Sequence, residues 1–316
     1  MLTLDEKKIR KGKPIGLPYQ GSKKKISKKI VEIIKQNFGT DKVVYDIFGG
    51  GGAITAECLL NGLDVRYNDF DKDITDMFQE VISQDREWIK TLIVNREEFY
   101  KIKNKADKTV DDNIKLLVNS FGNNSSGYLY GTEWSDMKYN LAIKIINKHD
   151  LFSGYRQTDT YKNAKRPYDE GNLDKNKVLQ QLQRLQQLEQ LQQLEQLQQL
   201  QQLQQLQQLQ QLQQLQQLQR LEVTNLSYEA FSDIEGAIFY LDPPYENTTH
   251  KAYKGDFDSR RFYDWVYQMS KRNTVLISSY EISDPRFEVA YEFKTARSTF
   301  QRGNAGKRYE KLFMVK

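Results

Sequence analysis

The chain has 316 residues, a formal net charge of +5 and a sequence pI of 8.9, which is compatible with a polyanionic partner. Cys58 is the single cysteine and His149 and His250 are the only histidines. An intramolecular disulfide is therefore excluded, and a His-built metal site or a His-based triad is disfavoured. No apolar stretch approaches the ~20 residues of a membrane span, so we expect no membrane partner. The single cysteine fits a reducing, cytoplasmic compartment, and the scarcity of histidine leads us to expect no bound metal.

Residues 1–75 alternate between helical and strand-like patterns. Apolar residues recur at helical spacing after Lys24, and a Gly-rich turn separates a short apolar run from the next helix. A strand, a Gly turn, a helix and a second strand in this order indicate a βαβ unit with a right-handed crossover. The expected elements are a helix over 24–38, a strand over 43–45, a helix over 53–61 and a strand over 65–67.

The rest of the chain falls into a central polar part and a final α/β part. Residues 76–178 are mostly helical in pattern, and a cluster of Gly, Asn, Ser and Tyr at 120–131 marks a loop. Residues 222–316 return to an α/β pattern, so the chain is predicted to hold one α/β fold split by an insertion. The expected elements of this final part are strands over 237–241, 274–278 and 308–315 and a helix that contains 265–269.

A low-complexity Leu-Gln-Gln repeat separates these parts, with leucine at every third position from Leu179 to Leu221. Strong helix formers and the absence of Gly and Pro favour a helix locally. At 3.6 residues per turn, however, each triplet moves the leucine by ~60° around the helix, so no single face is apolar. We therefore expect residues 179–221 to form a partly helical or disordered spacer rather than a coiled coil. Self-association through the repeat and in-frame variation of its length remain open hypotheses.

Asp242-Pro243-Pro244-Tyr245, at the end of an apolar strand, is the most specific motif. The carboxyl end of a strand in an open α/β sheet opens onto the ligand crevice. The prolines fix φ and remove two backbone donors, so the Asp242 carboxylate and the Pro243 carbonyl can accept both hydrogens of an exocyclic amine. Tyr245 offers a flat face on which a base can stack. The motif predicts methylation of a planar amine, and an ordinary turn after a strand is the alternative.

A second motif reads Asp-Ile-Phe-Gly-Gly-Gly-Gly over 46–52, after the first strand. Its glycines allow a ligand to approach the backbone closely, but it lacks the full dinucleotide fingerprint and the Lys-Ser/Thr ending of a P-loop. Asp69, just past the second strand, is placed to accept hydrogen bonds from ribose hydroxyls. Recognition of a nucleoside without phosphate machinery points to S-adenosylmethionine (SAM) as the cofactor. Lys23, within Tyr-Gln-Gly-Ser-Lys over 19–23, is placed to meet a cofactor carboxylate.

These motifs, in this order and together with Asn68-Asp69, resemble the Dam-type (alpha-group) DNA adenine N6-methyltransferases. The resemblance covers about 14–75 and 222–316. It implies a SAM-dependent methyltransferase with a Rossmann-like sheet and a target recognition domain inserted at 76–178. The implied reaction is direct in-line transfer of the methyl group of SAM to N6 of adenine in double-stranded DNA after base flipping. Restriction-modification is one context for such an enzyme, and the sequence indicates neither a target site nor a restriction partner.

The resemblance also implies roles for individual residues. Ser227 stands where the family often has an acid before an aromatic residue, which weakens one expected cofactor contact. Asp242, Pro243, Pro244 and Tyr245 are the expected catalytic residues. The expected SAM-binding residues are Tyr19, Lys23, Asp46, Phe48, Gly50, Gly52, Asp69, Tyr228 and Asp242.

DNA contacts are expected where basic and aromatic residues mix, in 120–131, in 156–166 and in the loop after the catalytic motif. Surface loops without DNA contact are the alternative. The residues predicted to bind DNA are Asn123, Asn124, Ser125, Tyr128, Tyr130, Arg156, Lys165, Arg166 and Lys254.

Two other functions compete with adenine methylation in DNA. The first is methylation of a planar amine in RNA or in a protein, although such enzymes more often begin the catalytic loop with Asn. The second is a non-catalytic DNA-binding or scaffold protein that works through the Leu-Gln repeat. Transfer of label from radiolabelled SAM to DNA discriminates between them.

Overall fold

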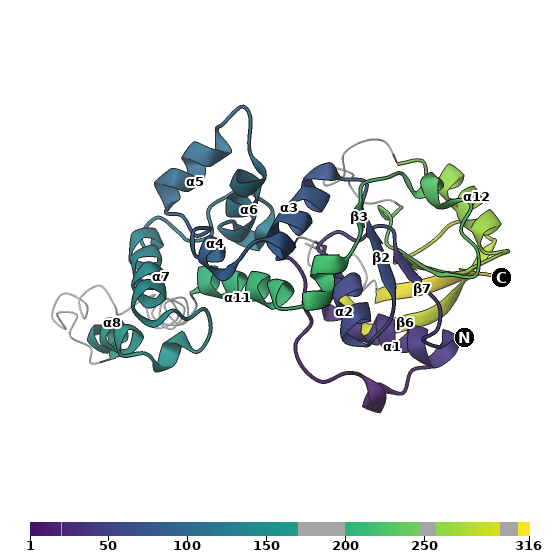
Figure 1. Cartoon of the computed structure of the whole chain (residues 1–316), viewed down its shortest axis with the longest axis horizontal. Helices are drawn as coiled ribbons and strands as arrows, with labels where there is room; N and C mark the ends of the chain where they lie inside the picture. Colours follow the sequence, from purple (N-terminus) through teal and green to yellow (C-terminus); the bar gives the residue numbers. More distant parts are fainter. Residues whose placement is uncertain (20, 170–199, 247–256, 298–308) are drawn as a thin grey trace, which may run out of the picture. The chain divides into compact units, whose positions relative to one another are not determined.

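The computed structural model describes residues 1–19, 21–169, 200–246, 257–297 and 309–316. Its contacts divide the chain into two compact units (Figure 1). Unit 1 comprises Met1–Ser83 and Gln211–Lys316, and unit 2 comprises Gln84–Gln210. These boundaries differ from those expected at 75, 178 and 221, because unit 1 extends to Ser83 and the repeat is divided between the two units. Within the described ranges, no helix is long and apolar enough to cross a membrane.

Unit 1 contains a seven-stranded sheet with the order β3-β2-β1-β4-β5-β7-β6. Strand β7 runs antiparallel to its neighbours β5 and β6, and the other pairs are parallel. Because β1 lies between β2 and β4, the chain order switches direction at this point, where open α/β sheets bind ligands. The α/β class expected from the sequence is confirmed. The strands are β1 (Val44–Asp46), β2 (Val65–Asn68), β3 (Val223–Thr224), β4 (Ile238–Leu241), β5 (Thr274–Ser279), β6 (Phe287–Arg297) and β7 (Tyr309–Val315).

Helices cover both faces of this sheet. In β4, Ile238 and Tyr240 pack in one core cluster with residues of α1 and α2, and Phe239 and Leu241 pack in another with residues of α12. Successive side chains of a strand point to opposite faces, so both faces of β4 are buried, which explains its continuous apolar run. The longer helices of unit 1 are α1 (Ser27–Phe38), α2 (Ala53–Leu60), α3 (Lys72–Ser83) and α12 (Ser259–Met269).

The strand β6 is one that the sequence analysis did not predict. Its pairing with β7 shifts register between Val289 and Tyr291, as at a β-bulge. Among residues 287–294, whose burial the structure describes, the buried ones are Phe287, Ala290 and Phe293, which are not spaced at every second position. A bulge inserts an extra residue into the strand, so the alternation by which a strand is identified from sequence is lost.

Unit 2 is mostly helical, as the sequence pattern of 76–178 indicates. A capping box opens α6, in which the Thr109 hydroxyl accepts from the backbone of Asp112 and the Asp112 carboxylate accepts from that of Thr109. One core cluster of this unit brings together Phe99, Leu116 and Tyr128. Its helices include α4 (Arg86–Lys90), α5 (Arg96–Lys103), α6 (Val110–Val118), α7 (Ser135–His149) and α8 (Asp159–Asp169).

The Leu-Gln-Gln repeat includes a helix, α11 (Gln201–Gln213), which agrees with the expected partial helicity. Its leucines are buried, however, which corrects the expectation of a spacer for this segment. Successive leucines are fully buried although they lie on different sides of the helix, whereas Gln204 is exposed. Neighbouring residues therefore surround the helix on several sides. A leucine stripe that winds around the helix can be buried in such surroundings. Because these leucines are buried, they offer no surface for self-association, and residues 179–199 lie outside the described ranges. The fully buried leucines in α11 and directly before it are Leu200, Leu203, Leu206, Leu209 and Leu212.

A buried glutamine also anchors the repeat within unit 2. The side-chain nitrogen of Gln202 lies 3.0 Å from the carbonyl oxygen of Val94 and 2.6 Å from Oδ1 of Asn119. The Asn119 amide in turn donates to the carbonyl oxygen of Leu92 at 2.8 Å. Buried polar groups are costly unless they are hydrogen-bonded, so this network favours one placement of the helix against unit 2.

Candidate active site

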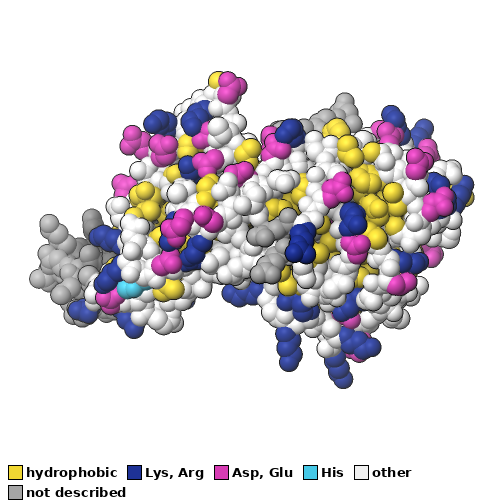
Figure 2. Space-filling view, in the orientation of Figure 1, with side chains coloured by type: hydrophobic (Ala, Val, Ile, Leu, Met, Phe, Trp, Pro, Cys, Tyr) yellow, Lys and Arg dark blue, Asp and Glu magenta, His cyan; other side chains and the backbone are white. Residues whose placement is uncertain are grey.

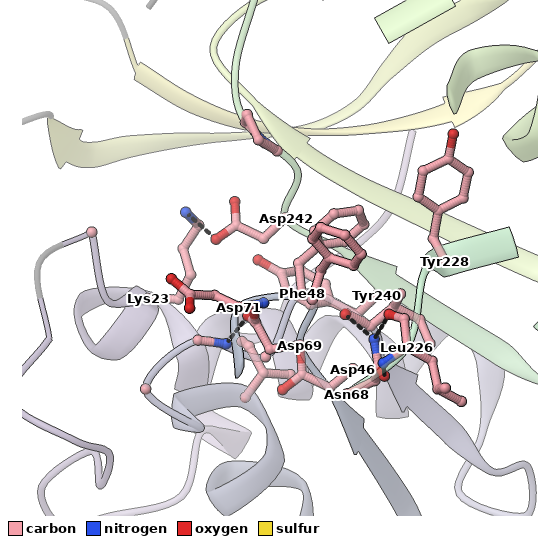
Figure 3. Close-up of a pocket in the computed structure, with 18 of the residues that line it drawn as sticks. Lys23, Asp46, Phe48, Asn68, Asp69, Asp71, Leu226, Tyr228, Tyr240 and Asp242 are labelled. Atoms are coloured by element: carbon pink, nitrogen blue, oxygen red, sulfur yellow. Dashed lines mark hydrogen bonds and ion pairs between the residues drawn. The ribbon is translucent and has the colours of Figure 1, made fainter. Parts of the chain in front are cut away.

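A cavity of about 720 Å³ lies at the carboxyl ends of the central parallel strands of unit 1 (Figure 3). Asp46 ends β1, Asn68 ends β2 and Asp242 directly follows β4. Parallel neighbouring strands end at the same edge of a sheet, so residues far apart in the sequence meet at this cavity. Of the residues expected to bind the cofactor, all but Gly52 line it.

Asp46 is a buried carboxylate at the wall of this cavity. Its Oδ2 accepts hydrogen bonds from the Thr55 backbone nitrogen at 3.1 Å and from the Thr55 hydroxyl at 2.7 Å. Its Oδ1 is buried without a hydrogen-bond partner among the described residues. Burial raises the pKa of Asp46 to about 7, and the bonds from Thr55 oppose that rise.

The glycine turn over 49–52 is required by close packing. A Cβ atom on Gly49 would lie 2.3 Å from a ring carbon of Tyr67, and one on Gly52 would lie 2.3 Å from a ring carbon of Phe78. Gly52 also has a φ of +70°, which side-chain-bearing residues rarely adopt. Gly52 therefore shapes the turn from behind rather than lining the cavity.

Asp69 connects this turn to the end of β2. Its Oδ2 accepts from the backbone nitrogen of Gly50 at 2.8 Å, and its Oδ1 accepts from that of Asp71 at 2.8 Å. Burial raises the pKa of Asp69 to about 6, and the two backbone hydrogen bonds oppose that rise. The carboxylate thus fixes the turn and faces the cavity at the same time. Asn68 beside it bonds the backbone of Leu226, which holds another lining residue in place.

Lys23 and Asp242 form an ion pair at the other part of the cavity (Figure 3). Lys23 lies in a short 3-10 turn (Lys23–Lys25) that the Ser22 side chain caps. Its Nζ is 2.7 Å from Oδ2 of Asp242 and 3.5 Å from Oε1 of Glu310. The sequence predicts that Lys23 meets a carboxylate of the cofactor, whereas the structure places its ammonium beside these two carboxylates of the protein.

Burial raises the pKa of Asp242 to about 6. The Lys23 ammonium opposes this rise, and the Glu310 carboxylate adds to it. The Tyr245 hydroxyl lies 3.0 Å from Oδ1 of Asp242 and also bonds Glu310, and its ring packs edge-on against Tyr280. Pro243 and Pro244 between them are buried.

Glu310 and Ser278 are parts of the site that sequence reasoning missed. The Ser278 hydroxyl of β5 donates to Oε1 of Glu310 in β7 at 2.9 Å, and both side chains are buried. In β7, the buried Glu310 and Leu312 alternate with the half-buried Lys311. Glu310 therefore occupies an inward position that usually holds an apolar residue. An acidic residue at an inward position of an alternating strand was the feature of the sequence that could have identified Glu310 as a site residue.

An aromatic group forms a further wall of the cavity. Phe48 packs edge-on against Phe262 at 5.7 Å and lies 6.4 Å from the ring of Tyr228. Phe70, which is 64% exposed, also lines the cavity although no motif marks it. Aromatic walls combined with convergent polar side chains are typical of a site for a small organic ligand.

The residues that were expected to bind DNA differ in how deeply they are buried. Tyr128 and Tyr130 are buried in unit 2, where their hydroxyls bond to Val94 and Gln202, so they are core residues and not stacking platforms. The other residues of the set are polar or basic and lie nearer the surface, except Lys254, which lies outside the described ranges. Asn124, Arg156 and Arg166 are exposed, and Asn123, Ser125 and Lys165 are half-buried.

Charge alone does not mark a DNA-binding face in the view shown. Basic and acidic side chains both occur over unit 1 and over unit 2 on the face drawn in Figure 2. Contacts with phosphates need positioned basic side chains, so the exposed Arg156 and Arg166 are the clearest candidates from the expected set.

A mostly parallel seven-stranded sheet with antiparallel β7 between β5 and β6, and a cavity at the carboxyl ends of β1, β2 and β4, define a Rossmann-like methyltransferase fold. Residues 19–292 match D12 class N6 adenine-specific DNA methyltransferases, and the chain belongs to this family. It is accordingly an adenine-specific DNA methyltransferase, which confirms the family resemblance and the enzyme class inferred from the motifs. No curated protein matches the chain significantly.

Proposed function

We propose that the chain transfers the methyl group of SAM to N6 of adenine in DNA, by direct in-line transfer after the base has left the duplex. The observation that carries the proposal is the position of Asp242, which faces the same cavity as the glycine turn and Asp69. One cavity therefore offers a nucleoside-binding edge and an acceptor for an exocyclic amine. Family membership supplies adenine and DNA as the substrate class.

The residues of the cavity fit SAM. The cavity volume of about 720 Å³ falls within the range of small-molecule sites. The partnerless Oδ1 of Asp46 is an acceptor suited to the amino group of the cofactor, and Asp69 is suited to its ribose. Tyr19, Phe48 and Gly50 line the remaining surface, and Tyr228 extends the aromatic wall.

The DNA amine is oriented by the loop that follows β4. When bound, SAM supplies an electrophilic methyl group on its sulfonium sulfur. The Asp242 carboxylate accepts one hydrogen of the amine, and the Pro243 carbonyl accepts the other, which aims the nitrogen lone pair along one line. Pro244 restricts the loop, and Tyr245 gives the base a ring to stack on. The reaction needs no covalent intermediate on the enzyme: as the amine nitrogen bonds to the methyl carbon, the carbon–sulfur bond would break, a neutral thioether would leave, and the methylated nitrogen would then lose one proton.

Target recognition is assigned in this proposal to residues 76–178. The exposed Arg156 and Arg166 supply phosphate contacts, and Asn123, Asn124, Ser125 and Lys165 supply polar ones. Phosphate contacts position a protein on DNA without reading its sequence, so they are consistent with any short target site.

The activity should depend on pH through Asp242. Its ordinary pKa of 3.8 is raised to about 6 by burial, so the carboxylate gains a proton as the pH falls through about 6. Protonation converts one acceptor oxygen into a donor, and kcat/KM for DNA should therefore fall below that pH. Initial rates between about pH 5 and 8 measure the effect, with circular dichroism as a control for folding. A flat profile through about pH 6 contradicts the role of ionised Asp242.

Asp69→Asn should weaken SAM binding by ~10-fold or more, because a hydrogen bond to a charged group contributes about 1.5–3 kcal/mol. Isothermal titration calorimetry with SAM measures the dissociation constant. Asp73→Asn, an exposed change on α3, is the matched control. Equal SAM affinity in Asp69→Asn and in the control would remove Asp69 from the cofactor site. Because Asp69 also holds the glycine turn, a thermal denaturation curve of each variant accompanies the titration.

Radiolabelled SAM tests the whole proposal. The chain is incubated with unmethylated duplex DNA, with the same DNA already methylated at N6, with RNA and with protein. Label that appears as N6-methyladenine only in unmethylated DNA supports the proposal. Label in RNA or protein favours the other amine methyltransferases, and DNA binding without any transfer favours a scaffold.

A further inference from the structure

A buried cluster behind the catalytic loop links three strands of the sheet to the turn before α1. Its members are Asp242 after β4, Tyr245 in the loop, Ser278 in β5, Glu310 in β7 and Lys23. Oε1 of Glu310 receives the Ser278 hydroxyl at 2.9 Å, lies 3.5 Å from Nζ of Lys23 and bonds the Tyr245 hydroxyl. Glu310 is only 6% exposed, so its charge is compensated by these groups rather than by water.

The Tyr245 hydroxyl lies between two carboxylates but has one hydrogen to donate. Oδ2 of Asp242 already has Lys23 at 2.7 Å, whereas Glu310 has the same ammonium at 3.5 Å. Glu310, whose contact with the ammonium is longer, therefore competes with Asp242 for the hydroxyl hydrogen. Whenever the hydrogen points to Glu310, Oδ1 of Asp242, 3.0 Å from the hydroxyl oxygen, keeps both of its lone pairs for other donors.

We propose that Glu310 is a positioning residue for methyl transfer: by competing for the Tyr245 hydroxyl hydrogen and sharing Lys23, it keeps Oδ1 of Asp242 a strong acceptor for the amine. The inference rests on the proposed function, because it assumes that Asp242 accepts a hydrogen of the substrate. Without Glu310, Tyr245 and Lys23 would both donate to Asp242 alone, which would weaken Asp242 as an acceptor of the amine. Glu310 does not touch the substrate in this scheme and acts through its neighbours.

The charges around Asp242 make this role measurable. Lys23 from the turn before α1 stabilises its ionised form, whereas Glu310 from β7 destabilises it. Asp46 at the end of β1 and Asp69 after β2 also interact with its charge, and Tyr245 donates to it or to Glu310. Replacing Glu310 with glutamine removes one negative charge and frees Lys23 for Asp242, so Asp242 should titrate at lower pH.

The test compares Glu310→Gln, Glu310→Ala and, as a matched control, Glu292→Gln, an exposed glutamate on the neighbouring β6. Carbon-13 NMR of the Asp242 carboxyl, assigned with Asp242→Asn, follows its titration without need of activity. The kcat, the SAM dissociation constant and a thermal denaturation curve are measured for the same proteins. We expect Glu310→Gln to lower the pH of the Asp242 titration and to reduce kcat by ~10-fold or more, with SAM affinity within ~3-fold of wild type.

Glu310→Ala should lose more kcat than Glu310→Gln, because the glutamine carbonyl can still accept the Tyr245 hydroxyl. Glu292→Gln should resemble wild type in every measurement. An unchanged Asp242 titration or an unchanged kcat in Glu310→Gln overturns the inference, as does a kcat that falls only in step with SAM affinity or folding. A wild-type chain that fails to methylate DNA sinks the proposed function instead, and the NMR titration still reports whether Glu310 governs Asp242.

Discussion

Asp242→Ala should abolish methyl transfer to DNA while the protein remains folded and still binds SAM, with unchanged or reduced affinity. The carboxylate is the group that orients the amine and stabilises the positive charge that develops on its nitrogen. Removing a single group of this kind typically lowers kcat by ~10²–10³-fold, and the amine here loses its only charged acceptor in the proposed mechanism. Rates are measured with radiolabelled SAM and duplex DNA, and SAM binding is measured by calorimetry.

Asp242→Asn separates charge from shape, because the amide has the same size but presents a donor where the carboxylate presents an acceptor. Asp233→Ala, an exposed change in the same half of the chain, is the control. Since Lys23 also lies near Glu310, it retains a carboxylate partner when Asp242 is removed, so no unpaired buried ammonium is expected to unfold the site. Transfer at the wild-type rate in either Asp242 variant contradicts the mechanism.

Leu206→Ala should destabilise the protein by about 2–5 kcal/mol, the usual cost of truncating a buried leucine. Leu206 lies in α11 and has 0% exposure, although it belongs to a segment that resembles a low-complexity spacer in sequence. Gln204→Ala in the same repeat is the control, because Gln204 is exposed and alanine is at least as good a helix former. Urea unfolding followed by circular dichroism measures both.

Equal urea midpoints for Leu206→Ala and Gln204→Ala would show that the repeat does not belong to the folded core. A large difference would show that the last triplets are structural. In that case, whole triplets can be added to the repeat or deleted from it, because each whole triplet keeps the Leu-Gln-Gln register of α11.

The sequence predicted the catalytic edge of the sheet well. The Asp-Pro-Pro-Tyr loop, the glycine turn and Asp69 are each short and local, and each follows a strand. A general rule for parallel sheets brings the carboxyl ends of neighbouring strands to one edge, so local motifs were sufficient to anticipate that Asp46, Asp69 and Asp242 share a cavity. The pattern of apolar residues also located α1, α2, α12 and most strands of unit 1.

The sequence was less informative where contacts cross large separations. Glu310 and Ser278 reach Asp242 from β7 and β5, and neither has a local pattern that refers to the catalytic loop. Tyr128 and Tyr130 belong to a polar, aromatic segment that is typical of a nucleic-acid surface, yet both are buried. Whether an aromatic residue faces solvent or a core depends on which helices pack over it, which composition does not encode.

The amino-acid sequence by itself determined the class of fold, the family and the loop that carries Asp242, because these depend on short motifs and on the periodicity of neighbouring residues. Only the tertiary structure decided that Lys23 pairs with Asp242, that Glu310 competes for the same ammonium, and that part of the repeat is core. The physical reason is that ion pairing and burial are set by the atoms that surround a side chain, and in this protein many of those atoms come from distant parts of the chain.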